Sequence, residues 1–358
     1  MSDGLAMSDG LDGVVVAETA LSLADPARGR LYVRGIELAV LVADRGFEGT
    51  VALLWEPEAA PASARAEMQR RLGAARPAAF ATLPAPSLPI EAGIRRALAA
   101  LPDDAMPETI LATLAVAAPA LIRAAAGQRP IPPDPTLSVA ADLLRMVHEA
   151  PAAPEAVAAL DTYMTVMAES GVSASSFAAR VVASTHASLP AAVLGAWCAF
   201  TGPLHGGAPG PTLDLLDALE TAPDKAAWIE ARLRAGARLM GFGHRLFRGN
   251  DPRAAAMRAA LERMGPAAGR LALATEVEAA VAGAIARVKP GLNLPANVEI
   301  MAALLLEAVG LPRAGFTAVF AVSRAAGWIA HAREQRERGR MFRPTSRYIG
   351  PPPEVPAN

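Results

Sequence analysis

From about Ala64 onward, the chain is a succession of helix-length segments in which apolar residues recur every three to four positions. Proline- and glycine-rich breaks separate these segments at residues 129–135, 151–154, 202–211 and 288–295. The sequence has no internal repeat and no regular alternation of strand and helix patterns, which argues against an α/β sheet. The pattern therefore predicts an all-α protein.

Residues 13–56 have a different pattern, with short apolar or alternating stretches such as Arg30-Leu31-Tyr32-Val33. Turn signals at Asp25-Pro26 and Gly29 separate these stretches. We expect a small β-ribbon here, in front of the helices.

Composition limits what fills the core and what the surface attracts. Apolar residues make up 53% of the chain and aromatic residues only 4%, so Ala, Leu and Val must fill closely packed helices. Lys and Arg total 34 and Asp and Glu total 35, a balance that gives no general field for nucleic acid or an anionic membrane. We expect neither as a partner, and any anion site must be local.

The N-terminus lacks the basic and apolar regions of a signal peptide, and residues 1–10 are expected to be disordered. The uncharged run 181–204 contains Ser, Thr, His, Pro and Gly residues, which indicates a buried core helix rather than a membrane span. The single cysteine, Cys198, is expected to be a packing residue. One free thiol fits a reducing cytoplasm, which is the predicted location.

Two of the five histidines lie in glycine-rich turns, where the backbone can closely approach a ligand. His205 lies in the turn 202–208 and is a candidate for catalysis, with a structural role as the alternative. His244 lies in 241–245, and the arginines that follow it suit a phosphate or a carboxylate, although solvated loop arginines are the alternative. The remaining histidines, His148, His186 and His331, are assigned to packing or the surface.

Two charged residues lie in apolar helical runs, Glu299 near the start of one run and Arg324 on the apolar face of another. Asn297 is a plausible N-cap, and Glu299 in the first turn of that helix needs no explanation beyond the helix dipole. Arg324 interrupts the apolar face of the helix predicted from Phe316 to about Arg338. A charge placed there needs a partner or an anionic ligand.

Taken in order, these segments resemble the citrate synthase family, from about Gly10 to Gly350. Residues 202–208 are similar to its GPLHGGA turn, 241–253 to its GxGHR…DPR loop, 295–299 to the segment with the catalytic carboxylate, and 316–331 with Arg343-Pro344 to its arginine helix and C-terminal arm. The likeness is weaker at 16–19, 29–35 and 175–185.

The resemblance implies an all-α, citrate synthase-like homodimer of two-domain subunits. The large domain would comprise residues 11–212 and 316–358, the latter including the arm, and the small domain would comprise residues 213–315. The implied reaction condenses an acyl-CoA, acetyl-CoA first, with a 2-oxo dicarboxylate such as oxaloacetate and releases free CoA. No cofactor beyond the CoA thioester is implied, and the sequence has no metal-ligand spacing.

Residue by residue, the resemblance assigns catalysis to His205, His244 and Glu299, with Glu299 as the base and His205 as the donor to the enolate oxygen. It assigns oxo-acid binding to Arg253, Arg324, Ser170 and Arg343, the last reaching across from the other subunit. It assigns CoA binding to Gly241, Phe242, Gly243 and Arg248.

Three positions depart from the family pattern. Glu299 replaces the usual aspartate, Ser170 replaces a histidine that binds the oxo acid, and Pro209-Gly210 replaces Asn-Glu. Two alternatives therefore stay open: a non-catalytic paralogue that binds CoA or a carboxylate as a sensor or partner subunit, and a citryl-CoA lyase-type enzyme. The three arginines favour a working enzyme, because desolvated cations without an anion are costly.

Overall fold

The computed structural model describes residues 9–11, 13–58, 61–85, 89–206, 209–243, 251–292 and 294–351. The predicted disordered start, residues 1–10, lies almost wholly outside these described residues. The elements are η1 (Asp9–Leu11), β1 (Ser22–Asp25), β2 (Arg30–Val33), β3 (Ile36–Glu37), α1 (Leu38–Val40), η2 (Leu41–Arg45), α2 (Gly46–Trp55), α3 (Pro61–Ala81), α4 (Ile90–Ala99), α5 (Pro107–Ala125), α6 (Val139–His148), α7 (Pro154–Met167), α8 (Ala174–Ser184), α9 (Leu189–Phe200), α10 (Pro209–Thr221), α11 (Lys225–Arg234), α12 (Pro252–Arg263), η3 (Gly265–Ala267), α13 (Leu271–Val288), α14 (Val298–Ala308), η4 (Arg313–Gly315) and α15 (Phe316–Arg338). The predicted all-α class is confirmed.

Side-chain caps and prolines explain where many of these helices begin. Oxygen atoms of Ser138, Ser173, Ser188, Asp224, Asp251 and Asn297 accept bonds from the first-turn N–H groups of α6, α8, α9, α11, α12 and α14. Proline occupies the first helical positions of α5, α7, α9 and α12, where its missing N–H costs nothing.

The predicted N-terminal ribbon exists but is shorter than expected. β1, β2 and β3 form an antiparallel sheet in that order, with Ser22 opposite Val33 and Tyr32 opposite Glu37. Residues 38–55 are helical, so the expectation of ribbon up to residue 56 is wrong there. The cause is burial: α2 is buried along its whole length, and a short apolar run that is buried on all sides has no period that separates strand from helix.

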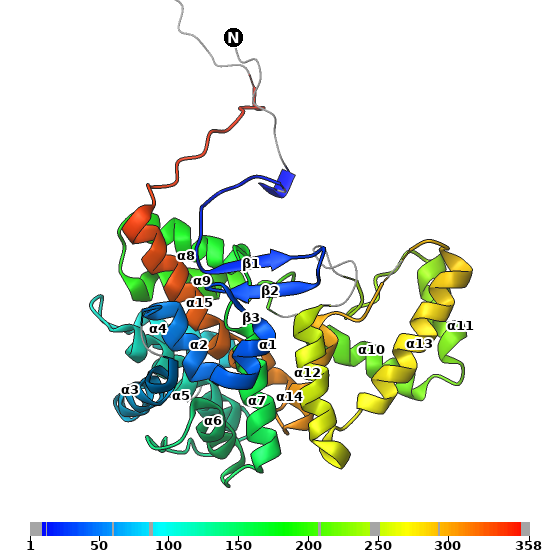
Figure 1. Ribbon diagram of the computed structural model, residues 1–358, viewed down its shortest axis with the longest axis horizontal. Helices are drawn as coiled ribbons and strands as arrows, with labels where there is room; N and C mark the ends of the chain where they lie inside the picture. The colour runs from blue at the N-terminus through cyan, green and yellow to red at the C-terminus, as the bar shows by residue number, and fades with distance from the viewer. Residues whose placement is uncertain are drawn as a thin grey trace, which may run out of the picture.

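The long helix α15 runs through the middle of the main helical body and contacts α2, α5, α7, α8 and α9 (Figure 1). Helix α5 is long and apolar enough to cross a membrane, but most of it is buried among α3, α4, α6 and α15. That is the position of a core helix in a folded domain.

The run 181–204 does not form one core helix. It is divided between α8 and α9, which pack against each other. Val181 and Cys198 are exposed, so the expectation that Cys198 is a packing residue is wrong. The apolar run is longer than either helix, and each helix has one face turned away from the core.

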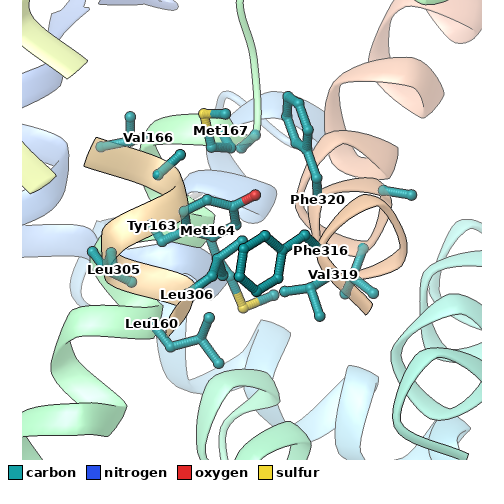
Figure 2. Packing of buried hydrophobic residues seen from close by; sticks show 14 of the residues in the cluster. Leu160, Tyr163, Met164, Val166, Met167, Leu305, Leu306, Phe316, Val319 and Phe320 are labelled. Carbon is teal, nitrogen blue, oxygen red and sulfur yellow. The ribbon is translucent and has the colours of Figure 1, made fainter. Parts of the chain in front are cut away.

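Helices α7, α14 and α15 meet in an apolar cluster (Figure 2). The cluster contains Leu160, Tyr163, Met164, Val166, Met167, Leu305, Leu306, Phe316, Val319 and Phe320. Because Met167 is the last residue of α7, this core fixes the start of the segment that follows it.

Helices α10, α11 and α13 lie to one side of the main body, with α12 and α14 between them and α7 (Figure 1). The N-terminal segment and the C-terminal tail leave the body on the same side (Figure 1). The predicted boundaries of the small domain, residues 213–315, stay a prediction.

Gly327 of α15 lies where no side chain fits. A Cβ atom at this position would stand 2.5 Å from the carbonyl oxygen of Ala168 and 2.5 Å from Oε2 of Glu169. We expect Gly327→Ala to lower the free energy of unfolding by about 1–3 kcal/mol, because the crowded atoms belong to a buried backbone and a buried carboxylate. Urea unfolding measures this change.

Gly283 of α13 provides the matched control, since a Cβ atom there meets only the end of the Arg287 side chain at 3.5 Å. Gly283→Ala should leave stability unchanged or raise it by up to about 1 kcal/mol through helix propensity. Equal effects of the two substitutions would contradict the steric argument.

Candidate active site

The segment 167–171, which we call the platform segment, follows α7 and contacts two buried arginines. Arg324 Nε of α15 donates to the carbonyl oxygen of Met167 at 2.6 Å. Arg253 Nη1 of α12 donates to Ser170 Oγ at 2.9 Å. The platform segment thus brings together two arginines that are far apart in the sequence.

Arg324 is a buried cation, with 3% of its surface exposed. Its guanidinium lies over the Phe320 ring at 5.0 Å from the centroid. Burial lowers the pKa of Arg324 to about 10, and the charge of Arg253 acts in the same direction, while Glu169 opposes both. Within the described residues, neither Nη nitrogen of Arg324 has a hydrogen-bond partner, which suits an anionic ligand.

Arg253 is 6% exposed and lies at the start of α12. Its Nε and Nη2 donate to the two carboxylate oxygens of Asp251 at 3.0 and 2.9 Å. Asp251 also caps α12 by accepting from the Arg253 backbone N–H. This two-bond pairing fixes the plane of the guanidinium, so that Nη1 is directed at Ser170.

His205 lies in the turn after α9, and its ring is held by two hydrogen bonds. Its Nε2 lies 2.8 Å from Ser175 Oγ and 3.4 Å from the Ser175 backbone N–H, which donates to it. Trp328 Nε1 donates to the same Ser175 Oγ at 3.0 Å. Since Nε2 accepts from the backbone, the ring proton of neutral His205 must be on Nδ1.

Burial lowers the pKa of His205 to about 4, and the nearby charge of Arg324 acts in the same direction. The Phe200 ring stands edge-on to the imidazole at 5.0 Å. Phe200 also contacts Phe320 and Trp328 edge-on, at 4.6 and 5.2 Å. The imidazole is therefore a neutral donor in a rigid, mostly aromatic setting.

Glu299 lies half-buried in the first turn of α14. Burial raises its pKa, against the charges of Arg253 and Arg238. Asn297 accepts from the Glu299 N–H through Oδ1 at 2.9 Å and donates from Nδ2 to the carbonyl of Gly243 at 2.9 Å. One side chain therefore fixes both the carboxylate and the glycine loop.

The glycine loop 241–243 runs antiparallel to residues 295–297. Gly243 N–H donates to the Pro295 carbonyl at 2.8 Å, and Asn297 N–H donates to the Gly241 carbonyl at 2.9 Å. Gly241 and Gly243 have φ values of 83° and 81°, a region that residues with a side chain rarely adopt.

Most of the predicted site residues gather in one place. The charge of Arg324 lowers the pKa of His205. The charge of Arg253 lowers the pKa of Arg324 and opposes the raised pKa of Glu299. Arg343 is exposed in the tail, where it lines a hollow with residues 16–20, Arg180 and the end of α15, none of which is a predicted site residue. The predicted residues His244 and Arg248 lie outside the described residues.

The sequence reasoning missed Ser175, Trp328 and Asp251. Ser175 and Trp328 hold His205 from α8 and α15, and Asp251 holds Arg253. Ser175 and Trp328 lie inside segments that carried the family resemblance, and Asp251 directly precedes Pro252-Arg253. Their hydrogen-bond partners, however, are set by the fold and not by spacing.

Two buried arginines, an imidazole and a half-buried carboxylate gather in this helical fold, an arrangement that suits an enzyme acting on an anionic substrate. Residues 10–345 match the family described as citrate synthase, C-terminal domain. The chain therefore belongs to the citrate synthase family, acyltransferases that condense an acyl-CoA with oxaloacetate.

Named relatives agree with this membership. The chain is 33% identical to a citrate synthase of Mycolicibacterium smegmatis, over 98% of this chain and 97% of that one. It is also 33% identical to a 2-methylcitrate synthase of Mycobacterium tuberculosis, over 95% of this chain and 90% of that one. The crystal structure of citrate synthase from Thermotoga maritima has a TM-score of 0.85 and 28% identity, covering 98% of each chain.

The geometry of His205 predicts its protonation. We expect ¹⁵N NMR to find a neutral ring at pH 7 with the proton on Nδ1, and protonation only as the pH approaches about 4. In the unfolded chain the ring takes its proton near pH 6.5, so this residue's contribution to stability falls as pH drops from about 6.5 to 4. A ring that is charged at pH 7, or that carries its proton on Nε2, would contradict the assignment.

Proposed function

We propose that this chain condenses acetyl-CoA with oxaloacetate to give citrate and free CoA, with His205 and Glu299 acting on the acyl-CoA. The observation that carries the proposal is the geometry of His205, whose Nε2 accepts a backbone hydrogen bond and leaves the proton of the neutral ring on Nδ1. The charge of Arg324 acts on this ring, and the charge of Arg253 acts on both Arg324 and Glu299. Family membership and relatives named as synthases favour synthesis over the sensor and lyase alternatives.

The first step is removal of a methyl proton from the thioester. Glu299 takes this proton, and burial helps because a carboxylate with a raised pKa is a stronger base. His205 donates from Nδ1 to the thioester oxygen, where negative charge develops. A neutral imidazole suits this role, because burial, with the charge of Arg324 acting in the same direction, keeps the ring from taking a second proton near neutral pH.

In the second step the α-carbon of the enolate bonds to the ketone carbon of the oxo acid. The ketone π bond opens, its oxygen takes a proton from water, and Glu299 returns its proton to solvent. Arg253 and Arg324 bind the two carboxylates of the acceptor, and their charge matches a dicarboxylate better than a neutral ketone. Ser170 accepts from Arg253, so its own hydroxyl hydrogen is left to donate to the acceptor. His244 contributes to binding the oxo acid.

The last step is hydrolysis of the citryl thioester: water adds to the acyl carbon, and CoA leaves as the thiol. Residues Gly241, Phe242, Gly243 and Arg248 bind the CoA portion. We assign residues 213–315 to a small domain that closes over both substrates, since it carries Arg253 and Glu299 while His205, Ser170 and Arg324 belong to the rest of the chain. The enzyme works without a cofactor, in the cytoplasm.

We further propose a homodimer in which Arg343 of the partner subunit completes the oxo-acid clamp. The tail after α15 is extended and exposed, and its proline residues keep it from folding back as a helix. Within the described residues Arg343 has no ion pair, and a cation at this position has a function if the tail reaches a neighbouring subunit.

Release of free CoA, followed with a thiol reagent, tests the reaction. We expect turnover of acetyl-CoA with oxaloacetate, and assays with propionyl-CoA in parallel measure acyl selectivity. His205→Asn should lower kcat by about 10²–10³-fold through loss of one donor to the developing charge. His186→Asn, the same change at an exposed histidine, is the control. No CoA release from any pairing of these acyl-CoAs with a panel of 2-oxo acids would refute the proposal.

Mixed dimers test the shared site. Arg343→Gln and His205→Asn should each be poorly active alone, whereas mixing the two after unfolding and refolding should restore about a quarter of wild-type activity. The reason is that half of the dimers become mixed, and each mixed dimer has one site with both native residues. If mixing restores nothing, Arg343 does not serve the partner subunit.

A further inference from the structure

The platform segment directs successive residues to different parts of the molecule. Met167 accepts from Arg324 and Ser170 accepts from Arg253 on the side of the site. Between them, the carbonyl of Ala168 accepts from Gly327 N–H at 3.1 Å, and the Glu169 side chain points into the protein. The positions of both clamp arginines therefore depend on how this short segment is held from behind.

Glu169 is 1% exposed, and three donors converge on its Oε1. Gly171 N–H donates at 2.6 Å, Ser22 Oγ at 2.9 Å, and His331 Nε2 lies at 3.0 Å. Within the described residues Oε2 has no partner, and it lies against the bare backbone of Gly327. One carboxylate oxygen thus ties the turn after Ser170 to β1 and to α15.

His331 has its orientation and its proton fixed by Arg180. Arg180 Nε donates to His331 Nδ1 at 2.8 Å, and because a guanidinium can only donate, Nδ1 has no proton. The proton of neutral His331 is therefore on Nε2 and is donated to Glu169. Arg180 is in turn paired with Glu334, whose Oε1 accepts from the Ala20 N–H at 2.8 Å.

We propose that the hydrogen bond from His331 to Glu169 is the anchor of the platform segment, which makes His331 a positioning residue for binding of the oxo acid. This inference rests on the proposed function for the identity of the ligand. The anchor acts through Glu169, which holds the turn that carries Ser170, and through the same backbone that accepts from Arg324. His331 and Glu169 are both buried and act on the ligand through the platform segment.

The charged and titratable groups around Glu169 set how the anchor responds to pH. His331 and Arg324 face it from α15, Arg180 of α8 acts through His331, and Arg253 of α12 lies beyond Ser170. Burial alone would raise the pKa of Glu169, but His331, Arg324 and Ser22 outweigh it and leave the pKa below the usual value. The Glu169 carboxylate is protonated as the pH falls through its pKa in the folded protein, and it then accepts its hydrogen bonds less well. Removing one donor raises this pKa, so that protonation occurs at a higher pH.

Three variants of the full-length protein test the anchor. His331→Phe removes both ring bonds, Ser22→Ala removes a different donor to the same oxygen, and His331→Gln keeps one acceptor for Arg180 and one donor for Glu169. We expect His331→Phe to weaken oxaloacetate binding roughly tenfold at pH 7 by calorimetry, and more at pH 6 than at pH 8. Ser22→Ala should act in the same direction with a smaller effect, and His331→Gln should stay within about threefold of wild type.

A general loss of packing would weaken the binding of both substrates, whereas loss of the anchor should weaken the binding of oxaloacetate alone. The KM for acyl-CoA, measured at saturating oxaloacetate, should therefore change less than about twofold in all three variants. Hydrogen exchange across residues 167–171 should be faster in His331→Phe and Ser22→Ala and close to wild type in His331→Gln. Should His331→Phe fail to fold, Ser22→Ala and His331→Gln still give opposite expectations.

Wild-type affinity for oxaloacetate in His331→Phe or Ser22→Ala, or equal weakening for both substrates, would overturn the inference and leave the proposed function intact. Failure of His331→Gln to restore binding would overturn it as well. If the wild-type protein binds no 2-oxo acid, the proposed function fails instead. Exchange across 167–171 then decides on the anchor, and unchanged protection in His331→Phe rules it out.

Discussion

The site depends on one costly arrangement: two guanidinium groups held close together and almost out of water. Arg253 offsets this cost with the Asp251 carboxylate. Among the described residues, Arg324 interacts with one carbonyl and one ring face, and electrostatically with Glu169 and Tyr163. A cation so poorly compensated is stable only because the surrounding core holds it, and an arriving dianion gains from meeting it. The packing of α7, α14 and α15 is what keeps that cation in place.

The elements of the site that could be predicted from the sequence are those carried by local motifs. Ser170 and Glu299 were assigned through the family resemblance. His205, Arg253 and Arg324 were each found from the residues themselves, namely from a glycine-rich turn, from the arginines that follow such a turn and from a charge on an apolar face. The fold brings all five together. The all-α class followed from periodicity in the same way. These are signals that a few neighbouring residues contain completely.

The rest could not be predicted, because it depends on contacts between distant segments. The sequence assigned His331 to packing or the surface, whereas it lies in a buried chain of polar groups whose members come from α8, α15 and the platform segment. Ser175 owes its importance to an imidazole thirty positions away. Residues 46–55 were misjudged because burial on every side removes the period that distinguishes strand from helix.

Phe200 stands edge-on to His205, Phe320 and Trp328 at once, so its ring is shared by the candidate acid, the helix of the oxo-acid clamp and the indole that supports Ser175. A change in the size of that ring would therefore disturb the imidazole, the clamp helix and the indole together, so position 200 tolerates little variation.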